Sequence, residues 1–475
     1  MFKQLRFLDG VKSVQKSFSR NGESWLYITA CILYLLGVWE HSSGNIYTDI
    51  VGVFVNRFCT PEPCMSHGLP YINFFVEYPP LTGFFMYAMG TIAHVFPFPG
   101  RGFLVSYYDY TSIFLLFPTL LLISDLLKIS DVIGIREKYK ISILFLVATP
   151  SFVFMLLLNW YIIGVFLMVW GLRKFLERDI LERVSPKRLR GNLIFSGMLF
   201  GLSAASNLVT AVPALGILIF GTRSWKERSQ FLFGILAALL GIYLPLIALN
   251  SVPHNYLNAQ HVLVSYQFYF PNLNVITDFT RYEQNWYTEG SWMLAFFSST
   301  DPIRHYIFPA LFAVLSIMIV LKGLRMEKQF YSPYVDRSTF VLMMCSLFTF
   351  AFLFSTYVCT PQMNLVLLPF FVLIPLLRRN YGEFLAFEIV NSLVIVWGFS
   401  YPLSFLGINT PTPVEFGSIW SSPIQFLVVV RSFWIGKFLI YDGLIKWRTS
   451  SKTIESSKEL LLINNTLRKI ISNFG

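Results

Sequence analysis

Two carboxylates stand in a polar segment that follows a long apolar stretch. Asp49 lies ten residues beyond Trp39, within the aromatic and apolar run NIYTDIVGVF. Glu77 lies two residues before a rigid double proline in FFVEYPPL, and the prolines restrict the direction of the chain. If the apolar stretch spans a membrane, a carboxylate just beyond it is placed to act as a general base on a substrate head group. We expect Asp49 and Glu77 to be catalytic; a helix cap or solvated loop acid is the alternative for Asp49, and a structural acid is the alternative for Glu77.

Basic side chains that could bind a phosphate group occur in two places. His254, His261 and Arg281 lie in one polar segment, and Arg431 lies within the last apolar stretch. A charge inside an apolar helix is costly unless it is paired or solvated, so it is a functional candidate. We expect these four residues to bind a phosphate group, with interfacial hydrogen bonding as the alternative for the histidines and a structural ion pair for Arg431.

Aromatic residues are dense in the same polar segment, and they include Trp286 and Tyr287. Their rings could bind sugars, although rings are also usual in the interfacial belt of membrane proteins. The sequence has no Gly-rich phosphate loop, no paired-cysteine zinc pattern and no His-Glu-x-x-His. We therefore expect no nucleotide, no nucleic acid, no metal and no other cofactor.

The elements that must position these residues follow from composition. Of the 475 residues 55% are hydrophobic and 13% are charged, whereas soluble domains carry about a quarter charged residues. The mean hydropathy is +0.58, so much of the surface must face lipid. The sequence therefore excludes a soluble globular fold and predicts a single all-α polytopic membrane domain over residues 1–475.

Apolar stretches separated by short basic clusters predict about twelve transmembrane helices. Their expected ranges are 25–39, 103–127, 141–157, 160–172, 193–206, 208–220, 231–249, 306–320, 340–354, 365–377, 384–401 and 424–441. Polar breaks at Asn159 and at Ser206 and Asn207 separate paired short helices, and such helices often line a water-accessible cavity.

The basic residues orient this arrangement. With both termini in the cytoplasm, 31 of the 37 Lys and Arg residues fall on the cytoplasmic side, four fall outside and two lie within the last span. Such an imbalance is typical of polytopic proteins. Two long segments are then external, 41–102 and 250–305, and residues 446–475 form a cytoplasmic tail. The apolar segment 81–96 is expected to be an interfacial or re-entrant helix, because counting it as a span would move a basic cluster outside.

Cys59 and Cys64 share the first external loop, in CTPEPC. If that compartment is oxidising, they can form a disulfide. Two free thiols remain the alternative.

Residues 49–81, with Gly68, Tyr71 and the run EYPPL, resemble the first external loop of the polytopic GT-C glycosyltransferases, especially their bacterial and archaeal mannosyltransferase-like branch. The run TPQMNLVLLP at 360–369 resembles a second signature of that branch, in which Pro-Gln opens a late helix. The break at Asn159 is similar in position.

The resemblance implies inverting transfer of a sugar, mannose in the first instance, from a polyprenyl- or dolichyl-phosphate donor to a lipid-linked or surface glycan outside the cytoplasm. It implies that Asp49 is the base, and that Tyr71, Tyr78 and Gln362 join Trp286 and Tyr287 in binding substrate. The plasma membrane of a prokaryote is the expected location. A transporter or lipid-linked glycan flippase is the alternative, as is a polysaccharide polymerase or ligase. The unequal external loops and the lack of a visible internal repeat count against a transporter.

Overall fold

A computed structural model describes residues 23–43, 48–59, 63–66, 68–74, 76, 78–133, 143, 146–184, 190–250, 303–327, 335–356, 359–374, 381–399 and 423–446. Within these ranges the regular structure is helical apart from one isolated bridge between Pro70 and Phe74, which confirms the all-α prediction. Residues 251–302 and 447–475 hold most of the expected second external loop and of the tail, and they lie outside the described residues.

Four helices of the described chain contain a segment long and apolar enough to cross a membrane. They are α4 (Phe103–Val132), α11 (Trp225–Asn250), α13 (Ile303–Glu327) and α14 (Val335–Ser355). A hydrocarbon core of about 30 Å needs about 20 residues of helix, and these segments have 19 to 30. The four helices indicate an integral membrane protein.

The other expected spans are not among the helices that are both long and apolar enough, and two of them are interrupted, so twelve membrane helices are not shown. The range 208–220 is divided among three short elements, and the range 365–377 begins in a 3₁₀ helix. Pro213 interrupts the α-helical hydrogen bonding within 208–220, because proline has no N–H to donate. The elements are α8 (Arg190–Ser206), α9 (Leu208–Ala211), α10 (Ala214–Gly216), η2 (Ile217–Gly221), η7 (Pro361–Val366) and α15 (Leu368–Leu373).

The remaining elements include a first helix over residues 23–42 and several short helices. They are α2 (Asp49–Phe58), α3 (Pro80–Val95), α6 (Pro150–Met155), α7 (Tyr161–Val184), α17 (Tyr381–Phe399), α19 (Pro423–Lys437) and η9 (Phe438–Lys446). The helix expected over 81–96 is confirmed as α3, which starts at Pro80 and ends before Phe96. Its interfacial placement stays a prediction.

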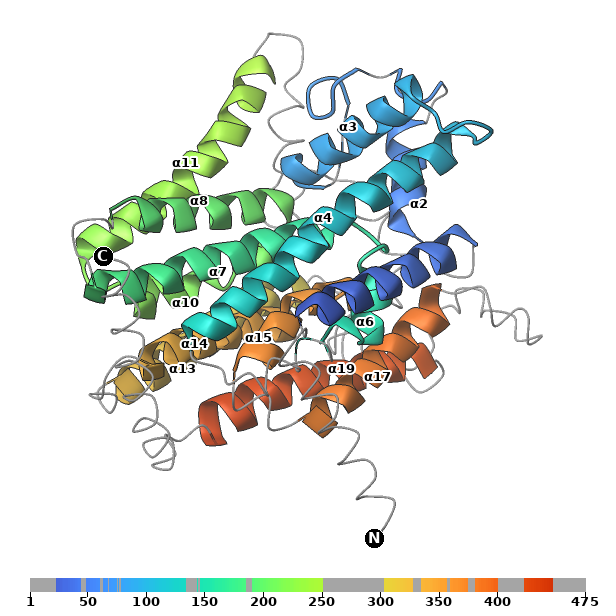
Figure 1. The fold of residues 1–475 in the computed structure, drawn as a ribbon. Helices are drawn as coiled ribbons and strands as arrows, with labels where there is room; N and C mark the ends of the chain where they lie inside the picture. The colour runs from blue at the N-terminus through green and yellow to red at the C-terminus, as the bar shows by residue number, and fades with distance from the viewer. Residues whose placement is uncertain are drawn as a thin grey trace.

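The helices pack in successive tiers (Figure 1). Helix α8 packs between α11 and α7, and α7 packs against α4. Helices α14, α17 and α19 lie on the far side of α7 from α8 in this view, with α2 and α3 near one end of the bundle. The short elements α6 and η7 contact each other and lie where these tiers meet.

Two glycines set the close packing of α8 on α11. A Cβ added to Gly197 would lie 2.1 Å from the carbonyl oxygen of Phe231, and one added to Gly234 would lie 2.1 Å from that of Ile194. Neither position has room for a side chain. Small residues that let two helix backbones approach in this way are typical of membrane helix pairs.

Buried ion pairs fasten α7 to its neighbours near its C-terminal half. Arg173 pairs with Asp125 of α4, with 2.7 Å between nitrogen and oxygen, and Arg178 pairs with Glu227 of α11, also at 2.7 Å. All four side chains are largely buried, and pairing is what makes charges tolerable there.

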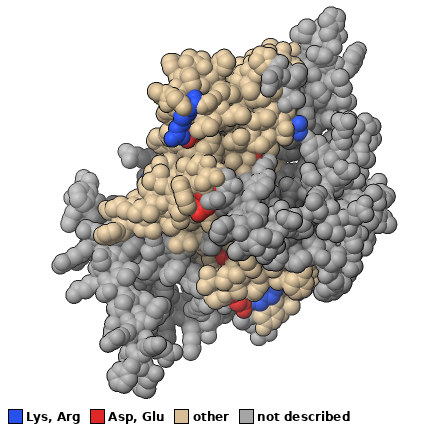
Figure 2. All heavy atoms as spheres, turned by 90° about the vertical axis from the view of Figure 1, so that its right-hand side faces the viewer, with Lys and Arg blue, Asp and Glu red and all other residues tan. Residues whose placement is uncertain are grey.

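Much of the outer surface is apolar. Large hydrophobic side chains are exposed along the first helix, α4, α11 and α13, for example Leu35, Phe117, Leu240 and Ile317. In Figure 2 the described part of the visible face is mostly uncharged, with a few scattered Lys, Arg, Asp and Glu side chains. A surface of this kind fits contact with lipid tails.

Candidate active site

A buried, non-helical segment between α6 and α7 is the centre of the candidate site. It consists of Leu157, Leu158, Asn159 and Trp160, each at most 1% exposed. Asn159 begins α7, because its Oδ1 accepts a hydrogen bond from the backbone N–H of Tyr161 at 3.0 Å. This confirms the predicted break at Asn159, and we call residues 157–160 the broken segment.

The start of α2 is hydrogen-bonded to the broken segment. The backbone N–H of Asp49 donates to the carbonyl oxygen of Leu158 at 2.8 Å, and the Thr48 hydroxyl donates to that of Leu157 at 2.7 Å. Thr48 also caps α2 by accepting from the N–H of Ile50. Since Thr48 is the cap, the half-buried Asp49 does not fill that role, and it occupies the first helical position, where the helix dipole favours a negative charge.

Tyr78, the residue after Glu77, also contacts the broken segment. The Tyr78 and Trp160 rings pack in a T-shaped pair, with 5.2 Å between ring centroids. The Tyr71 hydroxyl donates to the Tyr78 carbonyl oxygen at 2.6 Å, and the Thr82 hydroxyl donates to the Ser206 carbonyl oxygen at 3.0 Å. Residues 78–82 are therefore held between the breaks that precede α7 and α9.

Tyr71 is 1% exposed and has a φ of 65°, in the left-handed region that few non-glycine residues adopt. Its ring leaves no room at Gly83, where an added Cβ would lie 1.8 Å from the Tyr71 hydroxyl oxygen. In this structure Tyr71 fixes the loop that carries Tyr78. Its predicted contact with substrate stays a prediction.

The start of α6 lies in a second polar cluster, which the sequence predicted only through Gln362 and Arg431. Arg431 is fully buried, and its guanidinium donates to the Cys359 carbonyl oxygen and to Asn391 Oδ1. Asn391 in turn donates to the Ser151 hydroxyl at 2.8 Å and accepts from Asn364 at 2.6 Å. These contacts are hydrogen bonds to a backbone carbonyl and to an amide oxygen, so the phosphate role of Arg431 and the alternative ion pair both stay predictions.

Sequence reasoning missed Asn391 and Glu388, both fully buried on α17. A signal was present, because Glu388, Asn391 and Ser392 recur at helical spacing in an otherwise apolar stretch. Gln362 is buried on η7, and its Oε1 has no hydrogen-bond partner in the described part of the chain.

Several predicted site residues lie outside the described residues. They are Glu77, His254, His261, Arg281, Trp286 and Tyr287. Their roles stay predictions. Within the described ranges no group of three or more His, Cys, Asp and Glu side chains could hold a metal ion.

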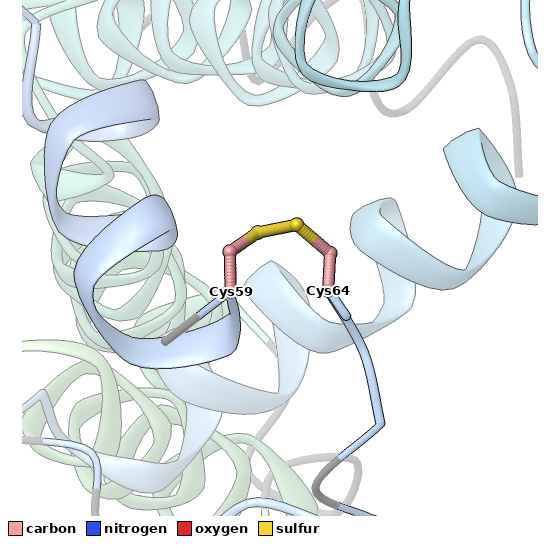
Figure 3. Close-up of a disulfide and its surroundings, with 2 residues drawn as sticks. All are labelled: Cys59 and Cys64. Carbon is pink, nitrogen blue, oxygen red and sulfur yellow. A yellow bond between two sulfur atoms is a disulfide. The ribbon is translucent and has the colours of Figure 1, made fainter. Parts of the chain in front are cut away.

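Cys59 and Cys64 form a disulfide directly after α2 (Figure 3). Next to it, the N–H of Met65 donates to the carbonyl oxygen of Phe58 at 2.7 Å. The bridge closes the chain back onto the helix that Asp49 begins. Of the two sequence alternatives, the structure has the disulfide, which is typical of an oxidising compartment.

Comparison with known proteins found a distant structural likeness. No protein family and no curated protein matches the sequence. The crystal structure of the apo form of the Archaeoglobus fulgidus oligosaccharyltransferase is similar to this chain with a TM-score of 0.42 and 12% sequence identity. The likeness covers 90% of this chain and 56% of that protein, so this chain spans little more than half of its length. A likeness at this level assigns no activity.

Proposed function

We propose that this chain is a GT-C glycosyltransferase that moves a sugar from a polyprenyl- or dolichyl-phosphate donor to a lipid-linked or surface glycan on the extracytoplasmic face. One observation carries the proposal. The start of α2 with Asp49, and the chain next to Glu77, are held on the same broken segment, although Asp49 and Leu158 lie far apart in the sequence. Mannose is the first sugar to test, on the strength of the sequence resemblance.

In the proposed reaction the Asp49 carboxylate accepts the proton of the acceptor hydroxyl. The hydroxyl oxygen bonds to the anomeric carbon, the bond from that carbon to the phosphate oxygen breaks, and the phosphate leaves with the electron pair. The configuration inverts in this single displacement. The positive end of α2 favours the ionised form of Asp49, which is the form that can accept a proton. Glu77 orients the acceptor or Asp49.

The phosphate group needs donors, which are predicted in His254, His261, Arg281 and Arg431. Arg431 is the least suited of these, because it would have to release the Cys359 carbonyl to reach a ligand. The sugar is proposed to pack on Tyr78, Trp286 and Tyr287, with Gln362 as a further contact.

The proposed orientation has both termini in the cytoplasm of a prokaryote. It is supported by the unequal distribution of basic residues and by the Cys59–Cys64 disulfide. Single cysteines introduced into 250–305 should react with a membrane-impermeant maleimide from outside intact cells. Reaction only after the cytoplasmic side is opened would reverse the orientation.

The direct test of the proposed function uses purified protein in detergent. It is incubated with polyprenyl phosphates carrying mannose, glucose or galactose and with a panel of glycan acceptors. Glycosylated acceptor together with released polyprenyl phosphate is the expected result. Movement of lipid-linked sugar across proteoliposomes without any new glycosidic bond would instead establish the flippase alternative.

A further inference from the structure

Two hydrogen-bond donors of the broken segment have no partner among the described residues. They are the Nδ2 amide of Asn159 and the Nε1 indole N–H of Trp160. Both residues are 1% exposed, so water does not reach these atoms from the surface. Buried polar groups are nearly always hydrogen-bonded, and each exception calls for a physical reason.

The local chain explains why the two donors are left over. Asn159 uses its Oδ1 to accept from the N–H of Tyr161, which turns its amide to donate elsewhere. Trp160 is fixed by the Tyr78 ring packed at its side. The indole N–H can only donate, and the Asn159 amide nitrogen can only donate. A ligand at this place must therefore supply acceptor oxygens.

The neighbouring helix selects the charge of that ligand. Helix α7 is 24 residues long and begins directly after the two donors. The N-terminal end of a long helix carries a partial positive charge and favours anions such as phosphate.

We propose that Asn159 Nδ2 and Trp160 Nε1 bind a phosphate oxyanion at the start of α7. Neutral donors suit this place because Asp49 is bonded to the adjacent Leu158. A Lys or Arg beside Asp49 would pair with its carboxylate and make it a weaker base. Asn and Trp hold the phosphate without that effect. The assignment deepens the proposed sugar transfer and rests on it for the source of the phosphate.

The experiment measures binding of farnesyl phosphate to the full-length protein in detergent by calorimetric titration. Farnesol tests the lipid chain without phosphate, and inorganic phosphate tests the anion without lipid. Wild-type protein should bind farnesyl phosphate and not farnesol. Binding of inorganic phosphate as well would identify the anion as sufficient, and binding of farnesyl phosphate alone would identify a lipid phosphate.

The diagnostic variants are Trp160→Phe, which keeps an aromatic ring against Tyr78, and Asn159→Ser, which keeps an oxygen able to cap α7. Each should raise the Kd for farnesyl phosphate roughly 10- to 100-fold, the range for a hydrogen bond to a charged group. Neither change removes a hydrogen bond that the described residues make, so both variants should stay folded, with a modest fall in melting temperature for Trp160→Phe because the smaller ring leaves a cavity.

Trp170→Phe is the matched control. Its Nε1 is also buried without a partner among the described residues, but it lies ten residues further along α7, about 15 Å by helical rise. It should keep the wild-type Kd. Wild-type affinity in Trp160→Phe and Asn159→Ser, or equal binding of farnesol by wild-type protein, would overturn the proposal.

Phosphate binding and sugar transfer can fail separately. If the variants lose farnesyl phosphate while wild-type protein forms no glycosidic bond with any donor, the oxyanion site stands and the transferase proposal fails. If wild-type protein transfers sugar and both variants keep its Kd for farnesyl phosphate, the oxyanion site fails and the transferase proposal stands.

Discussion

Two polar regions meet the two ends of the short helix α6, and they differ in what they leave unpaired. At its C-terminal end, the broken segment has two donors without a partner in the described part of the chain, Asn159 Nδ2 and Trp160 Nε1. At its start, Ser151 belongs to the cluster of Arg431, Asn391 and Asn364, in which the side chains bond to one another.

The spare atoms of this second region include several acceptors. Gln362 Oε1, Asn364 Oδ1 and both carboxylate oxygens of Glu388 have no partner in hydrogen-bonding geometry among the described residues, although Glu388 lies beside Ser151 and Thr149. Two spare donors at a helix start suit an oxyanion, whereas the spare atoms of the second region combine these acceptors with the Thr360 hydroxyl, which can also donate. We propose substrate chemistry for the broken segment and a structural role for the Arg431 cluster, and mutations test each proposal.

The largest expected effect concerns the base. Asp49→Asn keeps the shape of the side chain but cannot accept a proton at neutral pH, so kcat for sugar transfer should fall about 10²- to 10⁴-fold. Its melting temperature should change little, because Thr48 provides the cap of α2. Glu77→Gln should lower kcat less. Full transfer by Asp49→Asn, with Glu77→Gln inactive, would move the base to Glu77.

The second prediction tests the structural role of the Arg431 cluster. Arg431→Met leaves the Cys359 carbonyl and Asn391 Oδ1 without their buried donor, so stability should fall by about 3 kcal/mol. Thermal unfolding in detergent measures the loss. Arg431→Lys keeps the charge but not the several N–H donors of the guanidinium, so its stability should lie between that of Arg431→Met and that of the wild type. Unchanged stability with a large rise in the Kd for farnesyl phosphate would return Arg431 to the substrate site.

The sequence predicts much of what is local in this structure. Asn159 interrupts an apolar run and does begin a helix, prolines bound α3 on both sides, and two cysteines five residues apart are joined. Each of these features depends on neighbouring residues alone.

Contacts between distant parts of the chain were not predictable from one sequence. Thr48 bonds to a carbonyl 109 residues away, and Asn391 bonds to Ser151 across 240 residues. Backbone carbonyls carry no sequence signal, so nothing marked Leu157 and Leu158 as the support of Asp49. The interruptions of the apolar stretches were not predictable either. Hydropathy shows that 208–220 is apolar, but it does not show that the helix is divided near Pro213.

The third prediction concerns the disulfide next to α2. Changing both Cys59 and Cys64 to Ser removes the disulfide. The free energy of unfolding should fall by about 2 kcal/mol, the chain-entropy value for so short a loop. The disulfide lies next to the helix that carries Asp49, so its loss should lower transfer activity. Its effect on stability should add to that of Arg431→Met, because the two sites are independent. A melting temperature that is the same with and without reductant in wild-type protein would contradict it.

The smallest expected effect concerns the hydrogen bond from Tyr71 to Tyr78, which holds the loop that packs on the broken segment. Tyr71→Phe removes the hydroxyl that donates to the Tyr78 carbonyl, so stability should fall by about 1 kcal/mol. Because the Tyr78 ring packs on Trp160, a looser loop should also lower kcat several-fold. Tyr110→Phe is the matched control, since its hydroxyl donates to the Phe96 carbonyl at 2.8 Å on an exposed part of α4, and it should keep the wild-type kcat. If Tyr71→Phe raises KM for the acceptor and leaves stability and kcat unchanged, Tyr71 contacts substrate directly, as the sequence resemblance implied. A fall in kcat with unchanged KM would instead establish it as a positioning residue, which is the role that its burial and its bond to Tyr78 support.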